Sequence, residues 1–396
     1  MSNQFKPINP DILIDNIAKS ISLNQSFITN ATYETGKLGT ALFYYYYGKY
    51  KQDESSLVIA NDLVESTLSN FSLNLFEKEY GTDSLDNHLS NIGRFVGFAN
   101  SNGFIDLNVN SYLANFDEIM FQLMRTKIQA GDLDINSGAI ASGEYFLSRI
   151  ISSNSCREPL EYMVNNLEKI ALVDEEGDYF WKAPSLHDRI YFGLSHGSAM
   201  IIAFLSRLAA CGIQVDLCHE LIRKSVSFVI KHKRTQDKGL FPIQLNDKIE
   251  STQFSMCYGD LGVGYALLRA AKELNDDYLQ NVAMEVLIDC TIRNRLDGLT
   301  LDASITYGAS GIAATFGKLN QLSNHPRFSE SEKYWYSQIP HYAFHENNYA
   351  GFKSRLVDPK PLWNICFGWG ITGIGISMIN GQDLKMPRID KLLMIA

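Results

Sequence analysis

The chain has 396 residues, of which 45% are hydrophobic and 20% are charged, and its formal net charge is −9. This composition supplies enough apolar surface for a large core and excludes an intrinsically disordered chain. A net negative charge without a basic face also argues against a nucleic-acid partner.

Cysteine usage and the N-terminal residues predict the compartment. The six cysteines are scattered without the spacing of a disulfide framework, and the first residues lack the basic-then-apolar pattern of a secretory signal. No apolar run approaches the roughly 18 residues that are needed to cross a bilayer. We therefore expect a cytoplasmic protein.

Along the chain, a glycine-containing turn followed by an apolar segment recurs seven times, at intervals of about 56 residues. Such an interval is long enough for two helices with their connections. The seven turns contain, in order, Gly36, the Gly93 to Gly97 stretch, Gly138, Gly197, Gly259, Gly308 and Gly370.

The segments after the turns and those between them differ in pattern. Residues 196–205 are apolar on most faces, which predicts a helix that is buried nearly all round. Residues 217–231 and 278–292 are amphipathic. The alternation predicts an all-α fold, an (α/α)7 toroid with an inner ring of seven buried helices and an outer ring of seven amphipathic ones. We expect residues 1–396 to form a single domain.

The turns are also where we expect chemistry. Glycine allows a positive φ or a close backbone approach, and the helix N-termini that follow would create positive potential. Three turns carry reactive side chains: Asp134 four residues before Gly138, His196 directly before Gly197, and Cys257 two residues before Gly259. A carboxylate, an imidazole and a thiol around one cavity suit acid–base chemistry or thiol addition.

These motifs resemble a known family. Residues 192–197 (Phe-Gly-Leu-Ser-His-Gly), residues 255–262 (Ser-Met-Cys-Tyr-Gly-Asp-Leu-Gly) and the sevenfold spacing are similar to the lanthionine synthetase C-like family, over roughly residues 36–379. The resemblance implies a zinc-containing cyclase, in which a cysteine thiol of a precursor peptide adds to dehydroalanine or dehydrobutyrine and forms a thioether ring. It also implies that the partners are a dehydrated precursor peptide with its leader, a dehydratase and an export transporter.

The same resemblance predicts the site residues. Asp134 and His196 match the active-site Asp and His of the family, and Cys257 matches one of three zinc ligands. The other two ligand positions hold Thr306 and Tyr307, and neither residue type is an ordinary zinc ligand. The acid–base half of the site is kept and the metal half is lost, unless Cys366 substitutes for a missing ligand.

Three functions remain open from the sequence. The first is a lanthionine-type cyclase without the usual zinc site, in which His196 moves the proton, Asp134 orients His196 or acts as its partner acid, and Tyr307 donates to the enolate oxygen. The second is a non-catalytic member that binds the precursor peptide and presents it to partner enzymes. The third, ranked lower, is a sugar hydrolase or lyase that uses two carboxylates from among Asp134, Asp260 and Asp302.

Overall fold

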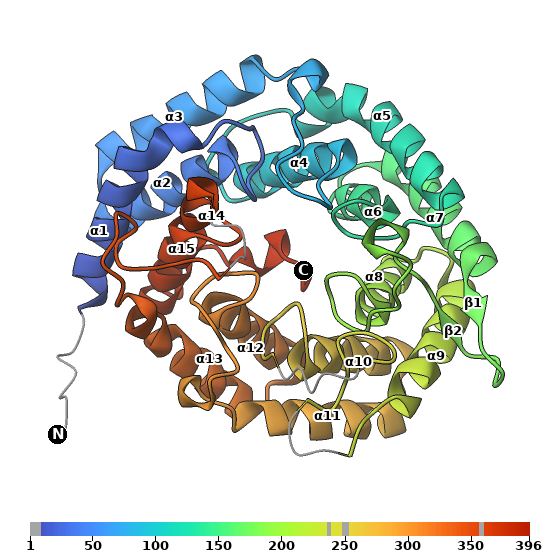
Figure 1. Cartoon of the computed structure of the whole chain (residues 1–396). Helices are drawn as coiled ribbons and strands as arrows, with labels where there is room; N and C mark the ends of the chain where they lie inside the picture. Colours follow the sequence, from blue (N-terminus) through green and yellow to red (C-terminus); the bar gives the residue numbers. More distant parts are fainter. Residues whose placement is uncertain (1–8, 236–238, 248–252, 356–359) are drawn as a thin grey trace, which may run out of the picture. The chain divides into compact units, whose positions relative to one another are not determined.

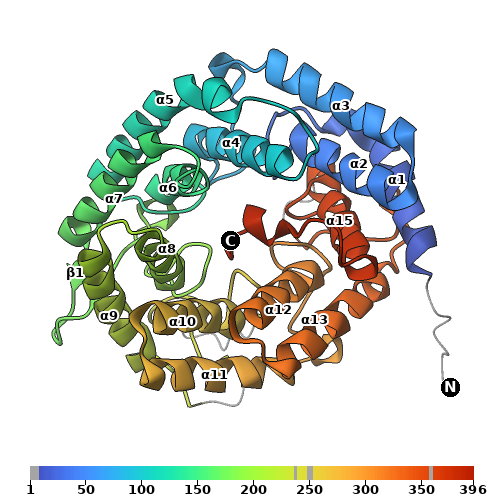
Figure 2. The same cartoon turned by 180° about the vertical axis from the view of Figure 1, so that it is seen from behind.

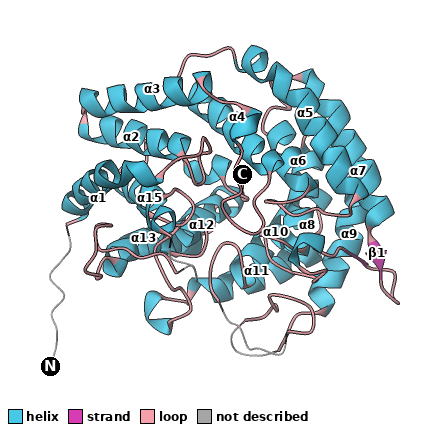
Figure 3. Ribbon diagram, turned by 45° about the horizontal axis from the view of Figure 1, so that its top comes forward, coloured by secondary structure: helices cyan, strands magenta, loops and turns pink. Residues whose placement is uncertain are grey.

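The computed structural model describes residues 9–235, 239–247, 253–355 and 360–396. The chain divides into two compact units, and each is described by itself. Unit 1 comprises residues 1–75 and 294–390, and unit 2 comprises residues 76–293 and 391–396. Nearly all regular structure in the described residues is helical (Figure 3).

Unit 2 contains the regular elements from α4 to α11 (Figure 1). Four largely buried helices each pack against an amphipathic helix that follows in the sequence. The buried helices are α4 (Leu85–Ser101), α6 (Ala139–Leu147), α8 (Ser198–Ala210) and α10 (Asp260–Leu274). The amphipathic helices are α5 (Val109–Gln129), α7 (Arg157–Ile170), α9 (Val215–Lys231) and α11 (Asp277–Thr291).

A small antiparallel hairpin, which the sequence patterns did not predict, also belongs to unit 2. It consists of β1 (Leu172–Val173) and β2 (Tyr179–Phe180), in a register that pairs Leu172 with Phe180. The hairpin packs on α9 through β2, where the Phe180 ring stacks on Phe228 at a centroid distance of 4.8 Å. The hairpin therefore covers the amphipathic helix α9 and is not part of the set of buried helices.

Unit 1 is built in the same way (Figure 2). Its buried helices are α2 (Lys37–Lys51), α12 (Ala309–Ser323) and α15 (Ile371–Gln382). Their more exposed partners are α3 (Glu54–Ser69), α13 (Pro326–Gln338) and α1 (Pro10–Asn24), and the short helix α14 (Pro361–Ile365) precedes α15.

The predicted alternation of buried and amphipathic helices is confirmed. The part of the chain that the structure describes supplies seven buried helices and seven amphipathic partners. Every residue of α6 is buried, as is every residue of α8 except the last, whereas α7 buries one face through Leu160, Val164 and Leu167. Apolar residues on all faces therefore indicated the buried helices correctly.

Six of the seven predicted glycine turns begin a buried helix, with the glycine as the N-cap residue of α2, α6, α8, α10, α12 or α15. The glycine is needed mainly for close approach. A Cβ atom on Gly138 would lie 2.2 Å from the Asp134 backbone nitrogen, and one on Gly197 would lie 2.2 Å from the Tyr191 carbonyl oxygen. Among these six residues only Gly259, at φ 86°, has left-handed backbone geometry.

The second predicted turn, at Gly93 to Gly97, is wrong. Both glycines lie inside α4, which instead begins at a side-chain cap from Ser84. A Cβ atom on Gly93 would lie 2.3 Å from the ring of Tyr145 on α6, so this glycine permits close helix packing rather than a turn.

No helix among the described residues combines the length and the apolar character that a membrane span requires.

Candidate active site

The structure brings Asp134 and His196 together. Asp134 lies in the turn before α6 and His196 in the turn before α8, and the Nδ1 atom of His196 contacts the Oδ2 atom of Asp134. The Asp134 side chain is completely buried, and that of His196 is 9% exposed. A buried carboxylate against one ring nitrogen fixes the orientation of the imidazole.

The local backbone holds the Asp134 carboxylate in place. Its Oδ1 atom accepts hydrogen bonds from the backbone nitrogens of Asn136 at 2.8 Å and Ser137 at 3.1 Å. The backbone nitrogen of Asp134 itself donates to Asp132 Oδ1 at 3.1 Å. Burial, to which the negative charge of Asp134 adds, raises the pKa of Asp132 above its usual range. The turn thus presents the Asp134 carboxylate to His196, while the Asp132 carboxylate accepts from the backbone of the same turn.

The His196 imidazole contacts two aromatic side chains. Its ring centroid lies 5.6 Å from that of Tyr191 and 6.0 Å from that of Tyr258. Because Nδ1 faces Asp134, Nε2 is the ring nitrogen that can exchange a proton with a substrate. The pair is therefore arranged for general acid–base chemistry.

Cys257 lies in the turn that packs against the His196 turn. The backbone nitrogen of Leu194 donates to the Cys257 carbonyl oxygen at 3.0 Å. A Cβ atom on Gly193 would lie 2.4 Å from the same oxygen, so the contact requires glycine there. The Cys257 side chain is fully buried. The turns that carry Asp134, His196 and Cys257 are thus adjacent, all within unit 2.

The remaining predicted site residues, Thr306, Tyr307 and Cys366, belong to unit 1. The Thr306 hydroxyl donates to the Gly368 carbonyl oxygen at 2.9 Å, and the Thr306 backbone nitrogen donates to the same oxygen at 3.0 Å. The backbone nitrogen of the half-buried Tyr307 donates to the Ser304 hydroxyl at 3.2 Å. Burial raises the pKa of the Cys366 thiol to about 12.

These donors do not fit the zinc site that the resemblance implies. The Thr306 hydroxyl joins two turns by donating to Gly368, and neither a threonine nor a tyrosine hydroxyl is an ordinary zinc ligand. Within the described ranges, no group of three or more His, Cys, Asp or Glu side chains is placed to hold a metal ion. Cys257 is the one member of the implied ligand set that has a suitable donor atom.

Asp260 and Asp302, the other carboxylates of the sugar-hydrolase hypothesis, serve to hold turns. Asp260 is fully buried, forms an ion pair with Arg293 at 2.5 Å and accepts backbone hydrogen bonds from residues 240 and 241. Asp302 accepts backbone hydrogen bonds from Ser304 at 2.9 Å and Arg355 at 3.1 Å. Neither is arranged as the acid or base that glycoside cleavage needs.

Sequence reasoning missed the residues that support the turns, although a signal for them was present. An Asn or Asp side chain caps the backbone nitrogen two residues later in three turns. The pairs are Asn30 with Thr32, Asp132 with Asp134, and Asp302 with Ser304, each beginning six residues before the glycine. This short-range pattern is typical of Asx turns.

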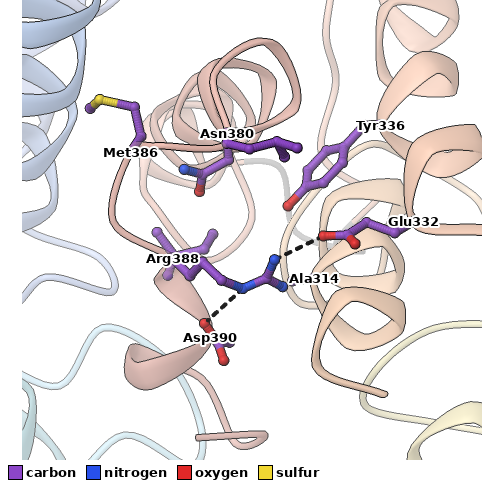
Figure 4. Close-up of a pocket in the computed structure, with 9 residues that line it drawn as sticks. Ala314, Glu332, Tyr336, Asn380, Met386, Arg388 and Asp390 are labelled. Carbon is purple, nitrogen blue, oxygen red and sulfur yellow. Dashed lines mark hydrogen bonds and ion pairs between the residues drawn. The ribbon is translucent and has the colours of Figure 1, made fainter. Parts of the chain in front are cut away.

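Two cavities elsewhere do not compete with this site. One, of about 10 Å³, is closed by Arg388, which bonds Glu332 and Asp390 (Figure 4), and its volume suits a single water molecule. The other, of about 720 Å³, lies at the C-terminal ends of α4, α6 and α8. Its lining includes a buried ion pair between Arg207 and Glu144, so both charges are already neutralised.

Comparisons with known proteins identify the family and the fold. A family model described as lanthionine synthetase C-like protein matches residues 28–394. The solved structure of a nisin cyclase superposes with a TM-score of 0.75 at 15% sequence identity, and the match covers 98% of each chain. No curated protein sequence matches this chain. The structural match confirms the predicted fold class, that of an all-helical toroid.

Proposed function

The chain belongs to the lanthionine synthetase C-like protein family, and on this premise we propose that it is a lanthionine-type peptide cyclase. The substrate is a dehydrated precursor peptide in which a cysteine thiol adds to dehydroalanine or dehydrobutyrine. The observation that carries the proposal is the contact between the buried Asp134 carboxylate and His196, next to the turn that contains Cys257. This pair supplies the proton transfers that such an addition needs.

In the proposed reaction, Nε2 of His196 takes the proton from the substrate thiol, and a sulfur electron pair forms the bond to the β-carbon of the dehydroamino acid. The π electrons of the carbon–carbon double bond move toward the neighbouring carbonyl and give an enolate. The imidazolium then returns the proton to the α-carbon, so no atom is lost. Asp134 holds the imidazole in one orientation through both transfers.

We also propose that the reaction proceeds without a zinc ion held by the family's ligand positions. The support is the chemistry of the side chains, since the hydroxyl groups of Thr306 and Tyr307 stand where the resemblance places thiolate and imidazole ligands, and the Thr306 hydroxyl already donates to Gly368. The N-termini of α6, α8 and α10 follow the site turns and favour a thiolate by about 1 kcal/mol or less each.

The test uses a synthetic peptide that contains one cysteine and one dehydroalanine. Ring closure leaves the mass unchanged and removes the free thiol, so labelling with N-ethylmaleimide followed by mass spectrometry reports the reaction. We expect wild-type protein to abolish labelling, and His196→Ala and Asp134→Asn to slow the reaction at least about 100-fold, as removal of a general acid–base group does. His219→Ala is the matched control, because this histidine pairs with Glu273 on α10 outside the site.

A second function, that of a non-catalytic member that binds and presents the precursor peptide, is favoured by the replaced ligand positions Thr306 and Tyr307. Peptide binding by the wild-type protein with unchanged thiol labelling, in the presence of the leader and a dehydratase, would support this function and contradict the cyclase. For either function we propose a cytoplasmic protein that works with a dehydratase and an export transporter.

A further inference from the structure

A second buried carboxylate–histidine pair lies at the start of α4, with Asp83 just before the helix and His88 in its first turn. His88 Nε2 lies 2.9 Å from Asp83 Oδ2, and the two residues are 5% and 4% exposed. The His88 ring meets Phe76 edge to face at a centroid distance of 4.8 Å. Since no part of the proposed reaction uses this pair, its burial needs another explanation.

Asp83 fixes the segment that leads into α4. Its Oδ2 atom accepts from the backbone nitrogen of Glu79 at 3.1 Å, and its Oδ1 atom accepts from that of Ser84 at 3.0 Å. Ser84 is the N-cap residue of α4, and its hydroxyl oxygen accepts from the Asn87 backbone nitrogen at 3.3 Å. The buried pair therefore holds Ser84 in one position.

Ser84 reaches the candidate active site. Its hydroxyl donates to the Asn136 carbonyl oxygen at 2.5 Å, and α4 packs against α6, which follows the Asn136 turn (Figure 1). That carbonyl belongs to the same peptide group as the Ser137 N–H, which donates to Asp134 Oδ1 at 3.1 Å. A hydrogen bond to the oxygen of a peptide group polarises it and strengthens donation by its N–H.

We propose that Ser84, held by Asp83 and His88, is a positioning residue for the Asp134–His196 pair. Hydrogen bonds link His88 to the Asp83 carboxylate, and that carboxylate to the Ser84 backbone nitrogen. The Ser84 hydroxyl is bonded to the 136–137 peptide group, which is bonded through its N–H to Asp134 and so reaches His196. Ser84 touches no reacting atom and acts through the carboxylate. Its catalytic consequence rests on the proposed function, but its effect on the geometry of the pair does not.

The experiment observes the Nδ1–H proton of His196 by NMR, because a proton between imidazole and carboxylate resonates at low field. His196→Ala assigns the signal. We expect Ser84→Gly to shift or broaden it away, and Ser84→Thr to retain it because the hydroxyl remains. Glycine suits the Ser84 test because an N-cap glycine costs a helix only a few tenths of a kcal/mol. Helix content by circular dichroism shows that each variant folds.

Asp276→Ala is the matched control, because Asp276 caps α11 through the Leu279 backbone nitrogen away from the 132–138 turn. An unchanged His196 signal in Ser84→Gly would overturn the proposal, and so would equal loss of the signal in Asp276→Ala. In the thiol-labelling assay, Ser84→Gly should lower the turnover rate about tenfold with little change in KM, as substitutions of supporting residues do. A wild-type protein without turnover would contradict the proposed function and leave the NMR comparison valid.

Discussion

The orientation of the Asp134 carboxylate is set largely by residues that are its immediate neighbours in the sequence. Its carboxylate accepts two backbone hydrogen bonds from its own turn, and its backbone nitrogen is capped by Asp132. These contacts lie within three residues along the chain, so the sequence could have indicated them. The contact with His196 spans 62 residues and depends on which turns the helices bring together.

Asp86 gives a prediction at the residue scale. This residue near the start of α4 is 1% exposed, and its Oδ2 atom has no hydrogen-bond partner among the described residues. Burial raises the pKa of Asp86 to about 6, the neighbouring Asp132 carboxylate adds a little, and the Ser84 hydroxyl and Lys127 offset part of the effect. The unfolded chain has a pKa near 4, so the folded state binds this proton more tightly.

This difference in pKa between the folded and unfolded chain sets the direction in which stability changes with pH. The Asp86 penalty is absent below about pH 4, grows as the pH rises, and is complete above about pH 6, where it amounts to about 3 kcal/mol at most. We expect Asp86→Asn to raise the free energy of unfolding at pH 7.5 and to leave it nearly unchanged at about pH 4. Urea unfolding of both proteins at the two pH values measures this. A stability difference that does not change with pH would contradict the assignment.

At the scale of the elements, the packing of α4 on α6 depends on a glycine within α4. Gly93 faces the Tyr145 ring, and that ring cannot easily move because its hydroxyl bonds Asp117 at 2.6 Å and contacts Arg149. Four residues later, a Cβ atom on Gly97 would meet open space, since beyond its chain neighbours and the local helix backbone none of the described residues has an atom within 4 Å of it. One helix therefore contains two glycines with opposite consequences for substitution.

We expect Gly93→Ala to destabilise the protein by up to about 2 kcal/mol, because overpacking costs about 1–3 kcal/mol and the gain in helix propensity offsets about 1 kcal/mol of that cost. Gly97→Ala is the matched control and should stabilise it by up to about 1 kcal/mol. Thermal or urea unfolding of the two variants provides the comparison. Equal effects of the two substitutions would show that the Tyr145 contact does not limit the packing.

At the scale of the whole molecule, the positions that the resemblance implies for zinc ligands are spread along the sequence. Cys257 belongs to unit 2, while Thr306, Tyr307 and Cys366 belong to unit 1. The family match covers residues 28–394, so it includes every one of these positions. The family assignment alone does not determine whether the protein binds zinc. The assignment rests on similarity over most of the chain, whereas zinc binding depends on a few donor atoms.

Elemental analysis of the purified protein tests the metal proposal. We expect no stoichiometric zinc, and we expect incubation with a strong chelator to leave the thiol-labelling rate unchanged. A variant that restores the family pair, Thr306→Cys with Tyr307→His, should bind zinc more tightly than the wild type, because thiolate and imidazole are the donors that zinc prefers. One zinc ion per wild-type chain would overturn our interpretation of Thr306 and Tyr307.

The sequence by itself determined the helical class, the alternation of buried and amphipathic helices and six of the glycine turns. These features depend on local periodicity and on backbone geometry within a few residues, which are legible along a single chain. The prediction of a turn at Gly93 to Gly97 was wrong for the same reason. Gly93 leaves space for the Tyr145 ring of another helix, and no pattern in the neighbouring sequence indicates such a contact.

Only the tertiary structure decided which side chains meet. The turns of Asp134, His196 and Cys257 become neighbours because α8 packs on α10 and contacts α6 through Gly143 and Glu144. The link from Ser84 to Asp134 exists because α4 packs on α6. Such contacts join residues far apart in the sequence, and their geometry depends on burial and helix packing rather than on local pattern. The residue types of the site could therefore be predicted from the sequence, whereas the hydrogen bonds that connect distant residues around it could not.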